Sequence, residues 1–202
     1  PVIHIDPDWP LVKLGDDHFF EIVSGGTPST KQPEYWDGDI FWATLVDLPQ
    51  ENIITIIRDT KRKITEKGLS KSSAKLLPKK SVIISSRATI GRIAINEIVL
   101  ATNQGFKNIL IKDYSKVNEV FLAFMLLNFV DLMNTLGTGG TYKEISKNSL
   151  STISVPIPPI EKQISIVEKI NKEQEMIEAN KALIDCFEEK IAACIKRVWE
   201  EG

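Results

Sequence analysis

Two polar loops carry the residue types that suit contact with a nucleic acid. The first is Ser24-Gly25-Gly26-Thr27-Pro28-Ser29-Thr30, followed by Lys31. Its glycines allow a backbone to approach a ligand closely, and its hydroxyl groups can meet phosphate oxygens. It lacks the Gly-Lys-Ser/Thr ending of a nucleotide-binding P-loop, and a plain turn would explain its composition equally well. The second loop, Gly137-Thr138-Gly139-Gly140-Thr141-Tyr142-Lys143, could reach DNA or merely link helices.

A basic tract lies between these loops in a chain whose net charge is −2. Residues 58–80 contain nine Lys and Arg residues, among them Arg62 and Lys75, and only two acidic residues. Such an excess is typical of a polyanion site, although a solvated loop can show the same pattern. Ser72 and Ser73, just before Lys75, add small hydrogen-bonding groups.

Arg87, Asn103 and Gln104 stand in short segments between apolar runs. Arginine, asparagine and glutamine carry the donor and acceptor pairs that fit guanine and adenine edges, so these positions are compatible with base readout. Equally, Arg87 could form a structural salt bridge, and Asn103-Gln104 could form a turn.

No set of residues points to catalysis. His4 and His18 have no Cys or His cluster that would make a zinc site. Asp6-Pro7-Asp8-Trp9 is faintly similar to an element of DNA amino-methyltransferases but lacks its second proline, and no glycine-rich methyl-donor loop precedes it. A nuclease motif and a Gly-x-Ser-x-Gly elbow are also absent from the sequence. We therefore predict a binding module without catalytic residues or a metal site.

The elements that would position these loops indicate an α+β fold. Apolar, β-branched runs predict strands at 40–45, 81–85, 91–95, 98–101 and 106–111. Helices are predicted from Asp16 or Asp17 through Val23, and at 70–76, 117–136 and 145–150. The expected organisation is a mixed, β-rich globular domain, residues 1–157, followed by a long coiled-coil-forming C-terminal helix, residues 158–202.

The long helix is predicted from a heptad pattern. Its a positions are Ile170, Ile177, Ile184, Ile191 and Val198, and its apolar d positions are Ile166, Phe187 and Cys194. A helix of this length measures roughly 60 Å, so we expect it to project and to need a partner helix. The alternative is that it folds back on its own domain. Polar Glu173 and Asn180 at d positions could fix the register of a helix pair.

The two cysteines and the apolar segments favour a cytoplasmic protein. Cys186 and Cys194 lie eight residues apart on the predicted helix, too far for a disulfide within one chain, and are expected to be reduced packing residues. The most apolar run, 121–130, is too short to span a bilayer, and no signal peptide opens the sequence, so no membrane partner is expected.

Seven motifs in this order resemble one target-recognition half of the specificity (S) subunit of type I restriction-modification systems. The motifs are Trp9-Pro10-Leu11-Val12-Lys13-Leu14-Gly15, Ser24-Gly25-Gly26-Thr27-Pro28-Ser29, Tyr35-Trp36-Asp37-Gly38-Asp39-Ile40 with Trp42, Ser72-Ser73-Ala74-Lys75-Leu76-Leu77-Pro78, Ser85-Ser86-Arg87-Ala88-Thr89-Ile90-Gly91, Asn103-Gln104-Gly105-Phe106, and Pro156-Ile157-Pro158-Pro159-Ile160-Glu161-Lys162-Gln163. They extend over nearly the whole chain.

The resemblance implies a subunit that reads one part of a split double-stranded DNA target and is not itself an enzyme. The implied partners are methyltransferase (M) and restriction (R) subunits and a second S half, in cis or as a homodimer. S-adenosylmethionine, ATP and Mg are expected on the partner subunits, with no cofactor in this chain. A complete S subunit usually has two recognition domains and two long helices, so this chain would be a fragment or a dimerising half. The rival hypothesis is an adaptor that binds M subunits or another S half through its helix without reading DNA.

The residues predicted to lie near DNA come from all of these loops. They are Gly25, Gly26, Thr27, Ser29, Lys31, Arg62, Ser72, Ser73, Lys75, Arg87, Gln104, Thr141, Tyr142 and Lys143. Arg87 and Gln104 are the candidates for base contacts, and the lysines and loop backbones are expected to contact phosphates.

Overall fold

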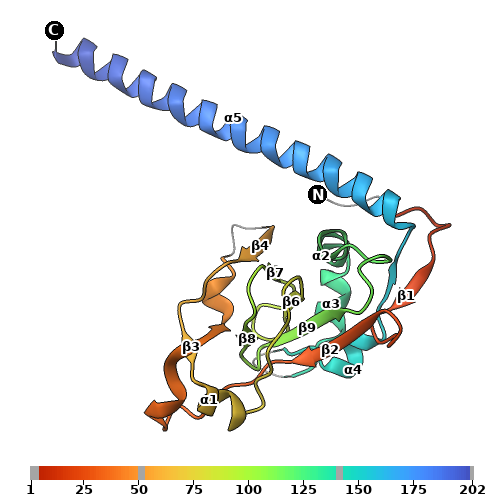
Figure 1. Ribbon diagram of the computed structural model, residues 1–202. Helices are drawn as coiled ribbons and strands as arrows, with labels where there is room; N and C mark the ends of the chain where they lie inside the picture. The colour runs from red at the N-terminus through yellow and green to blue at the C-terminus, as the bar shows by residue number, and fades with distance from the viewer. Residues whose placement is uncertain (1–4, 50–52, 140–142, 201–202) are drawn as a thin grey trace. The chain divides into compact units, whose positions relative to one another are not determined.

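The computed structural model describes residues 5–49, 53–139 and 143–200, with only the backbone given for Val198 and Glu200. Contacts divide the chain into two units, a globular unit of residues 1–163 and a helical unit of residues 164–202. Figure 1 shows the elements of both units. The predicted fold class, a mixed α+β domain followed by a long C-terminal helix, is confirmed.

A five-stranded sheet forms the centre of the globular unit. Its strand order is β2-β9-β6-β7-β4, and only the β4–β7 pair is parallel. The strands are β2 (Phe20–Ser24), β4 (Ile54–Ile57), β6 (Val82–Ser85), β7 (Ile93–Asn96) and β9 (Phe106–Ile111). Every residue of β6 and β7 is buried, which explains why both read as short, continuous apolar runs in the sequence.

A three-stranded sheet, in the order β5-β3-β8, lies beside the five-stranded one. It consists of β3 (Trp36–Ala43), β5 (Lys63–Ile64) and β8 (Ala101–Thr102), and the short helices η1 (Pro33–Tyr35), η2 (Leu45–Asp47) and α1 (Glu66–Ser70) flank it in sequence. Its core contains Trp36, Trp42, Ile64, Ala74 and Ala101. This core therefore joins β3 to the 72–75 segment through Ala74.

The remaining elements complete the globular unit. A two-stranded antiparallel sheet pairs β1 (Leu11–Lys13) with β10 (Ser154–Pro156). The helices are α2 (Glu119–Leu127), α3 (Val130–Leu136) and α4 (Lys147–Ser151). Helix α2 is buried from Phe121 to Leu126 and is capped by the side chain of Asn118, which accepts hydrogen bonds from two backbone N–H groups.

Several predicted elements are wrong in type or extent. The segment predicted as a helix from Asp16 or Asp17 forms a turn and then strand β2, because the Asp16 carboxylate accepts from the backbone of His18 while Phe20 pairs with Ile111. The predicted 70–76 helix is replaced by α1, which ends at Ser70. The predicted 117–136 helix is two helices bent by 66°.

Helix α5 (Ile160–Glu200) starts within the globular unit. The Gln163 side chain is fully buried, donates to the carbonyls of Lys116 and Pro158 at 2.8 and 2.7 Å, and accepts from the Asn118 N–H at 2.9 Å. The division between the two units by contacts falls after Gln163, because the first turn of α5 is bonded to the loop that precedes α2.

Candidate nucleic-acid interface

Three segments that are distant in sequence meet at one place in the globular unit. The Gly25 N–H donates to the Phe106 carbonyl and the Gly26 N–H to the Thr102 carbonyl, at 3.2 and 2.8 Å. A Cβ on Gly26 would lie 2.2 Å from the Ala74 nitrogen. The 24–30 loop, the 72–75 segment and the 102–106 turn are therefore packed directly on one another, as a common binding site requires.

Gly25 and Gly26 contact protein and are not surface residues. Both are buried, and a Cβ on Gly25 would lie 1.8 Å from the Asn103 carbonyl oxygen. The Gly26 carbonyl also accepts from the Trp42 indole N–H at 2.9 Å. The close backbone approach that these glycines permit is to neighbouring segments of the same chain. That they lie near DNA stays a prediction.

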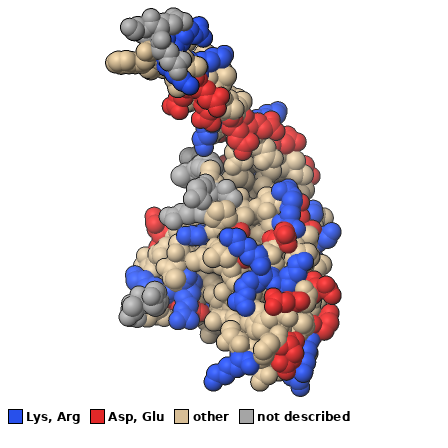
Figure 2. Space-filling model, turned by 90° about the vertical axis from the view of Figure 1, so that its left-hand side faces the viewer, with Lys and Arg blue, Asp and Glu red and all other residues tan. Residues whose placement is uncertain are grey.

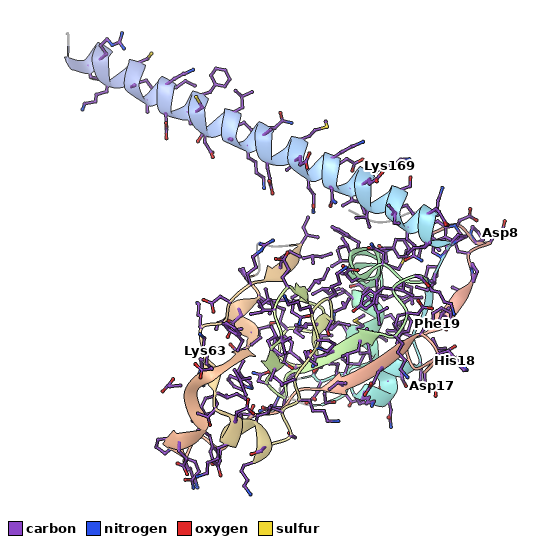
Figure 3. All side chains as sticks on the ribbon, viewed as in Figure 1. Asp8, Asp17, His18, Phe19, Lys63 and Lys169 are labelled. Atoms are coloured by element: carbon purple, nitrogen blue, oxygen red, sulfur yellow. The ribbon has the colours of Figure 1, made fainter. Side chains whose placement is uncertain are left out.

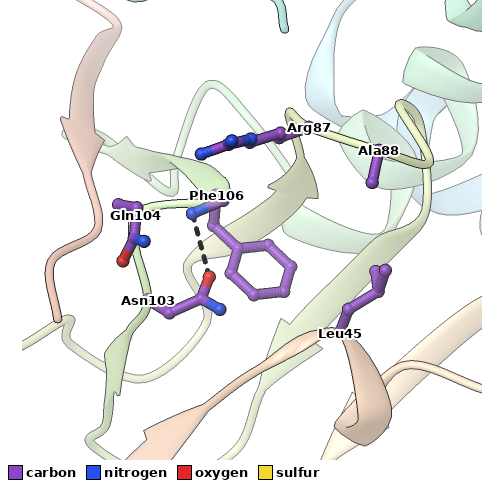
Figure 4. Close-up of a pocket in the computed structure, with 7 residues that line it drawn as sticks. Leu45, Arg87, Ala88, Asn103, Gln104 and Phe106 are labelled. Atoms are coloured by element: carbon purple, nitrogen blue, oxygen red, sulfur yellow. Dashed lines mark hydrogen bonds between the residues drawn. The ribbon is translucent and has the colours of Figure 1, made fainter. Parts of the chain in front are cut away.

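Arg87 and Gln104, the two residues predicted to read bases, line the same hollow of about 310 Å³ (Figure 4). Leu45 and Phe106 form part of its apolar lining. The Thr27 hydroxyl donates to Oε1 of Gln104, which orients that amide. An exposed guanidinium and an oriented amide at the rim of an apolar hollow form a surface that can meet base edges and apolar base groups.

The turn that carries Arg87 is fixed by backbone geometry. Ala88 adopts a positive φ of 63°, and Gly91 a φ of 96°. The Ser86 N–H donates to the Gly105 carbonyl at 2.7 Å, and the Ile145 N–H donates to the Ser86 carbonyl at 2.9 Å. The Arg87 turn is therefore held between the 102–106 turn and the 143–145 segment.

An ion pair between a buried lysine and a partly exposed glutamate supports the same region. The Lys107 ammonium lies 3.2 Å from a carboxylate oxygen of Glu144 and 3.3 Å from the Ser86 hydroxyl. The Lys107 side chain is 7% exposed and that of Glu144 is 41% exposed. The pair joins strand β9 to the segment after the glycine-rich loop, of which Thr141 and Tyr142 lie outside the described residues. Lys143, next to Glu144, is exposed.

The basic tract is only partly neutralised. Arg58 makes two hydrogen bonds with Glu97, at 2.7 and 2.8 Å, Lys67 pairs with Glu34, and Lys80 pairs with Glu119. Within the described ranges, no carboxylate lies within 4.0 Å of the charged groups of the tract's other bases, which are Lys61, Arg62, Lys63, Lys71, Lys75 and Lys79. On the side of the unit that Figure 2 shows, Lys and Arg side chains gather near the middle of the surface.

Arg62 is held by an aromatic pair. Its guanidinium carbon lies 3.9 Å from the centroid of the Trp36 ring and 5.3 Å from that of Trp42. The two indoles pack edge to face, with centroids 5.0 Å apart. The Trp36 indole N–H donates to the Ser29 carbonyl at 3.2 Å. Arg62 and the end of the 24–30 loop are thus supported by the same two side chains.

The other predicted residues have simpler environments. Ser29, Lys31, Ser73 and Lys75 are exposed. The Ser72 hydroxyl donates to the Leu69 carbonyl and accepts from the Ala74 N–H, so it shapes the turn after α1.

Two further features concern the electrostatics of the globular unit. The Glu34 carboxyl has a lowered pKa, chiefly because of a backbone hydrogen bond and further because of Lys67. Asp16, Asp17 and His18 are close enough together to hold a cation. Figure 3 shows Asp17 and His18 far from Lys63, on the other side of the globular unit. Exposed acidic groups often cluster without an ion, so this group is no part of the candidate interface.

Four of the apolar heptad positions of α5 form an exposed apolar row: Ile177, Ile184, Phe187 and Ile191 are between 52% and 58% exposed. Nearer the start of the helix, Ile166 is half-buried and Ile170 is buried. The side chain of Val198 lies outside the described part of the chain. Cys186 and Cys194 are free and exposed, so the packing role predicted for them is not met within this chain and would require a partner helix.

Among the described residues, no single helix is long and apolar enough to cross a membrane. In that part of the chain, α2 and α3 together are long and apolar enough, but they are bent by 66° at the break between them.

Several residues of this surface were not identified from the sequence. Trp36 and Trp42 belong to the core of the three-stranded sheet, and their rings and indole N–H groups also hold Arg62 and the 24–30 loop. Trp36 and Trp42 are separated by an even number of residues on one strand, β3, which indicates that their side chains lie on the same face. That spacing could have identified them as a pair from the sequence. Lys107 could also have been identified from the sequence, because a lysine within the apolar run 106–111 indicates a buried charge that needs a partner.

Comparisons with known proteins agree with this architecture. The family described as "Type I restriction modification DNA specificity domain" matches residues 7–188. The type I restriction enzyme MjaIX specificity subunit of Methanocaldococcus jannaschii is 35% identical over 195 residues, which are 96% of this chain and 44% of that protein. The EcoR124I/EcoR124II specificity subunit of Escherichia coli is 28% identical over 153 residues, 73% of this chain and 37% of that protein.

Solved structures show the same fold. The HsdS subunit from Thermoanaerobacter tengcongensis aligns with a TM-score of 0.62 at 20% identity, covering 89% of this chain and 40% of that one. A structure described as "Structural basis underlying complex assembly and conformational transition of the type I R-M system" gives a TM-score of 0.65 at 20% identity, covering 89% and 41%. The chain thus spans about two fifths of the length of the proteins that it matches. It belongs to the family of type I restriction modification DNA specificity domains.

Proposed function

We propose that this chain reads one part of a split double-stranded DNA target, as one recognition half of a type I specificity subunit. The observation that carries the proposal is the meeting of Arg87 and Gln104 at one hollow, although 17 positions separate them in sequence. The unpaired lysines of the 58–80 tract supply the positive charge that phosphate contacts need. Base contacts would then come from the hollow and phosphate contacts from the tract.

The chain itself acts as a binding subunit in this proposal. Methyl transfer and cleavage belong to M and R subunits, which would hold S-adenosylmethionine, ATP and Mg. The apolar row on α5 supports association with a second S half, in cis or in a homodimer, because four large apolar side chains more than half exposed favour burial against another helix. In that arrangement α5 would set the distance between two recognition halves, and removal of one heptad should change the spacing of the methylated half-sites.

The experiment that tests DNA reading is the genomic methylation pattern of a strain that carries the intact system, with this chain present, deleted or altered. Deletion should abolish one bipartite methylated motif. Arg87→Ala should relax or abolish recognition at about one base pair, a loss of roughly 1–3 kcal/mol, whereas Lys75→Ala should weaken methylation at all sites alike. Lys116→Ala is the control, since the Lys116 ammonium pairs with Asp113 at 3.6 Å.

The same experiment distinguishes the adaptor hypothesis, which the exposed row on α5 alone would also satisfy. An adaptor would still bind M subunits, but Arg87→Ala and Lys75→Ala would leave the methylated motif and its extent unchanged. That result would reject the proposed reading surface.

A further inference from the structure

Arg58 and Arg62 lie in the same basic tract, but the structure gives their charges different surroundings. The Nε and Nη2 donors of Arg58 are occupied by the two oxygens of the Glu97 carboxylate, at 2.7 and 2.8 Å. Arg62 has no carboxylate within 4.0 Å among the described residues, and its cation lies over the Trp36 ring instead. A guanidinium stacked on an aromatic face keeps its edge donors free for a second partner.

The backbone of Arg62 is fixed as well as its side chain. Its carbonyl accepts from the Thr60 hydroxyl at 2.7 Å and from the Trp42 N–H at 3.1 Å. The side chain is exposed, whereas Trp36 beneath it is 9% exposed. Restricting a long side chain in this way lowers the conformational entropy that is lost when it binds an anion.

The same two tryptophans also position the neighbouring loop. The Trp42 indole N–H donates to the Gly26 carbonyl at 2.9 Å, and the Trp36 indole N–H donates to the Ser29 carbonyl at 3.2 Å. Ser29 itself is exposed, and its hydroxyl accepts from the Lys31 N–H. The loop therefore presents exposed polar groups from a backbone anchored by the residues that hold Arg62.

We propose that Trp36 is a positioning residue for a DNA phosphate site in which Arg62 supplies the charge and the adjoining loop around Ser29 supplies further donors. The inference rests on the proposed function, because the ligand is a backbone phosphate of the duplex. A planar guanidinium with two free donors suits a pair of phosphate oxygens. An arginine that an indole ring holds in place loses less conformational entropy on making that contact than an arginine whose side chain moves freely.

The test is a double-mutant cycle on binding of the full chain, assembled with M subunits, to a duplex that contains the methylated motif. Fluorescence anisotropy would be followed between about 50 and 300 mM salt. Arg62→Ala should weaken binding about 5- to 20-fold and reduce the magnitude of the salt slope by about 1. Trp36→Leu should weaken binding about 3- to 20-fold, but by less than about 2-fold when Arg62 is already alanine.

Two further variants separate positioning from folding. Trp36→Phe retains an aromatic face and loses the indole N–H, so it should keep most of the coupling to Arg62. Arg58→Ala is the matched control in the same tract and should change the salt slope by much less than Arg62→Ala. In the absence of DNA, Arg62→Ala should also shift the tryptophan emission, and Arg58→Ala should not.

The outcomes distinguish this inference from the function on which it rests. If the parent assembly binds the duplex with motif preference but Trp36→Leu and Arg62→Ala act additively, the positioning role of Trp36 is rejected and DNA reading stands. Equal salt slopes for Arg58→Ala and Arg62→Ala would reject the phosphate contact at Arg62. If the parent shows no motif preference, the proposed function fails and this site fails with it.

Discussion

Substitution of Gly26 tests whether the 24–30 loop is a packing element or a ligand-contacting one. In Gly26→Ala the added methyl carbon would lie 2.2 Å from the Ala74 nitrogen and 2.3 Å from the Ser73 carbonyl carbon, both backbone atoms. Ordinary contacts of this kind lie near 3.4 Å or beyond, so the loop and the 72–75 segment must separate by about 1 Å. Overpacking of this kind costs about 1–3 kcal/mol.

The same displacement weakens two hydrogen bonds of Gly26. One joins its N–H to the Thr102 carbonyl at 2.8 Å, and the other joins the Trp42 indole to its carbonyl at 2.9 Å. Each hydrogen bond contributes about 1 kcal/mol. Only part of that free energy is lost, because the partner groups on Thr102 and Trp42 can shift together with Gly26. We therefore expect Gly26→Ala to lower the free energy of unfolding by about 3 kcal/mol, a fall in Tm of roughly 6–12 °C for a chain of this size.

The assay is thermal unfolding followed by circular dichroism, with Gly105→Ala as the matched control. A Cβ on Gly105 would meet only the Asn103 side chain, with the nearest atom, its oxygen, at 3.1 Å, and that side chain can move. The control should change stability by less than about 1 kcal/mol. If Gly26→Ala unfolds within about 2 °C of the parent while losing DNA affinity, the packing argument is refuted and the glycine contacts the ligand after all.

Two other substitutions test the supports of the same unit. Glu144→Gln should lower the free energy of unfolding in urea by about 1–3 kcal/mol, because it leaves the buried Lys107 ammonium without its counter-charge. Lys107→Met should lower it by less, because the Glu144 carboxylate that remains can be reached by water. A larger loss in Lys107→Met than in Glu144→Gln would contradict this account of the pair. Gln163→Leu should cost about 2–4 kcal/mol, since it leaves one backbone N–H and two carbonyls without partners. Faster hydrogen exchange at the Asn118 amide would locate that loss, and an unchanged exchange rate there would argue against it.

Local sequence patterns were sufficient where burial and periodicity decide the structure. The run 106–111 was predicted as a strand and is β9 with the same bounds, because all but one of its side chains are buried. The heptad spacing likewise predicted the 41-residue helix α5. By contrast, a carboxylate at Asp16 is compatible with either a helix cap or a turn. The turn forms because Phe20 pairs with Ile111, which is distant in sequence.

The sequence predicted which loops contribute residues to the candidate site, but not what each residue contacts there. Spacing placed Arg87 and Gln104 in loops, yet their meeting at one hollow depends on the pairing of β6 with β9, which is a long-range contact. Glycine in a polar loop indicates that something approaches its backbone. It does not tell whether that is a ligand or, as at Gly25, the carbonyl of Asn103.

The charge of the 58–80 tract illustrates why composition overstates a binding surface. Nine basic residues in the sequence suggest nine phosphate contacts, but Arg58, Lys67 and Lys80 each face a carboxylate of the same unit. Arg62 is the opposite case, because its counterpart is an indole face, which stabilises a cation without neutralising it. Since each phosphate contact adds about 0.9 to the salt slope, the tract can contribute no more than its six unpaired bases allow. Folding therefore selects, within one basic stretch, which charges remain available to DNA.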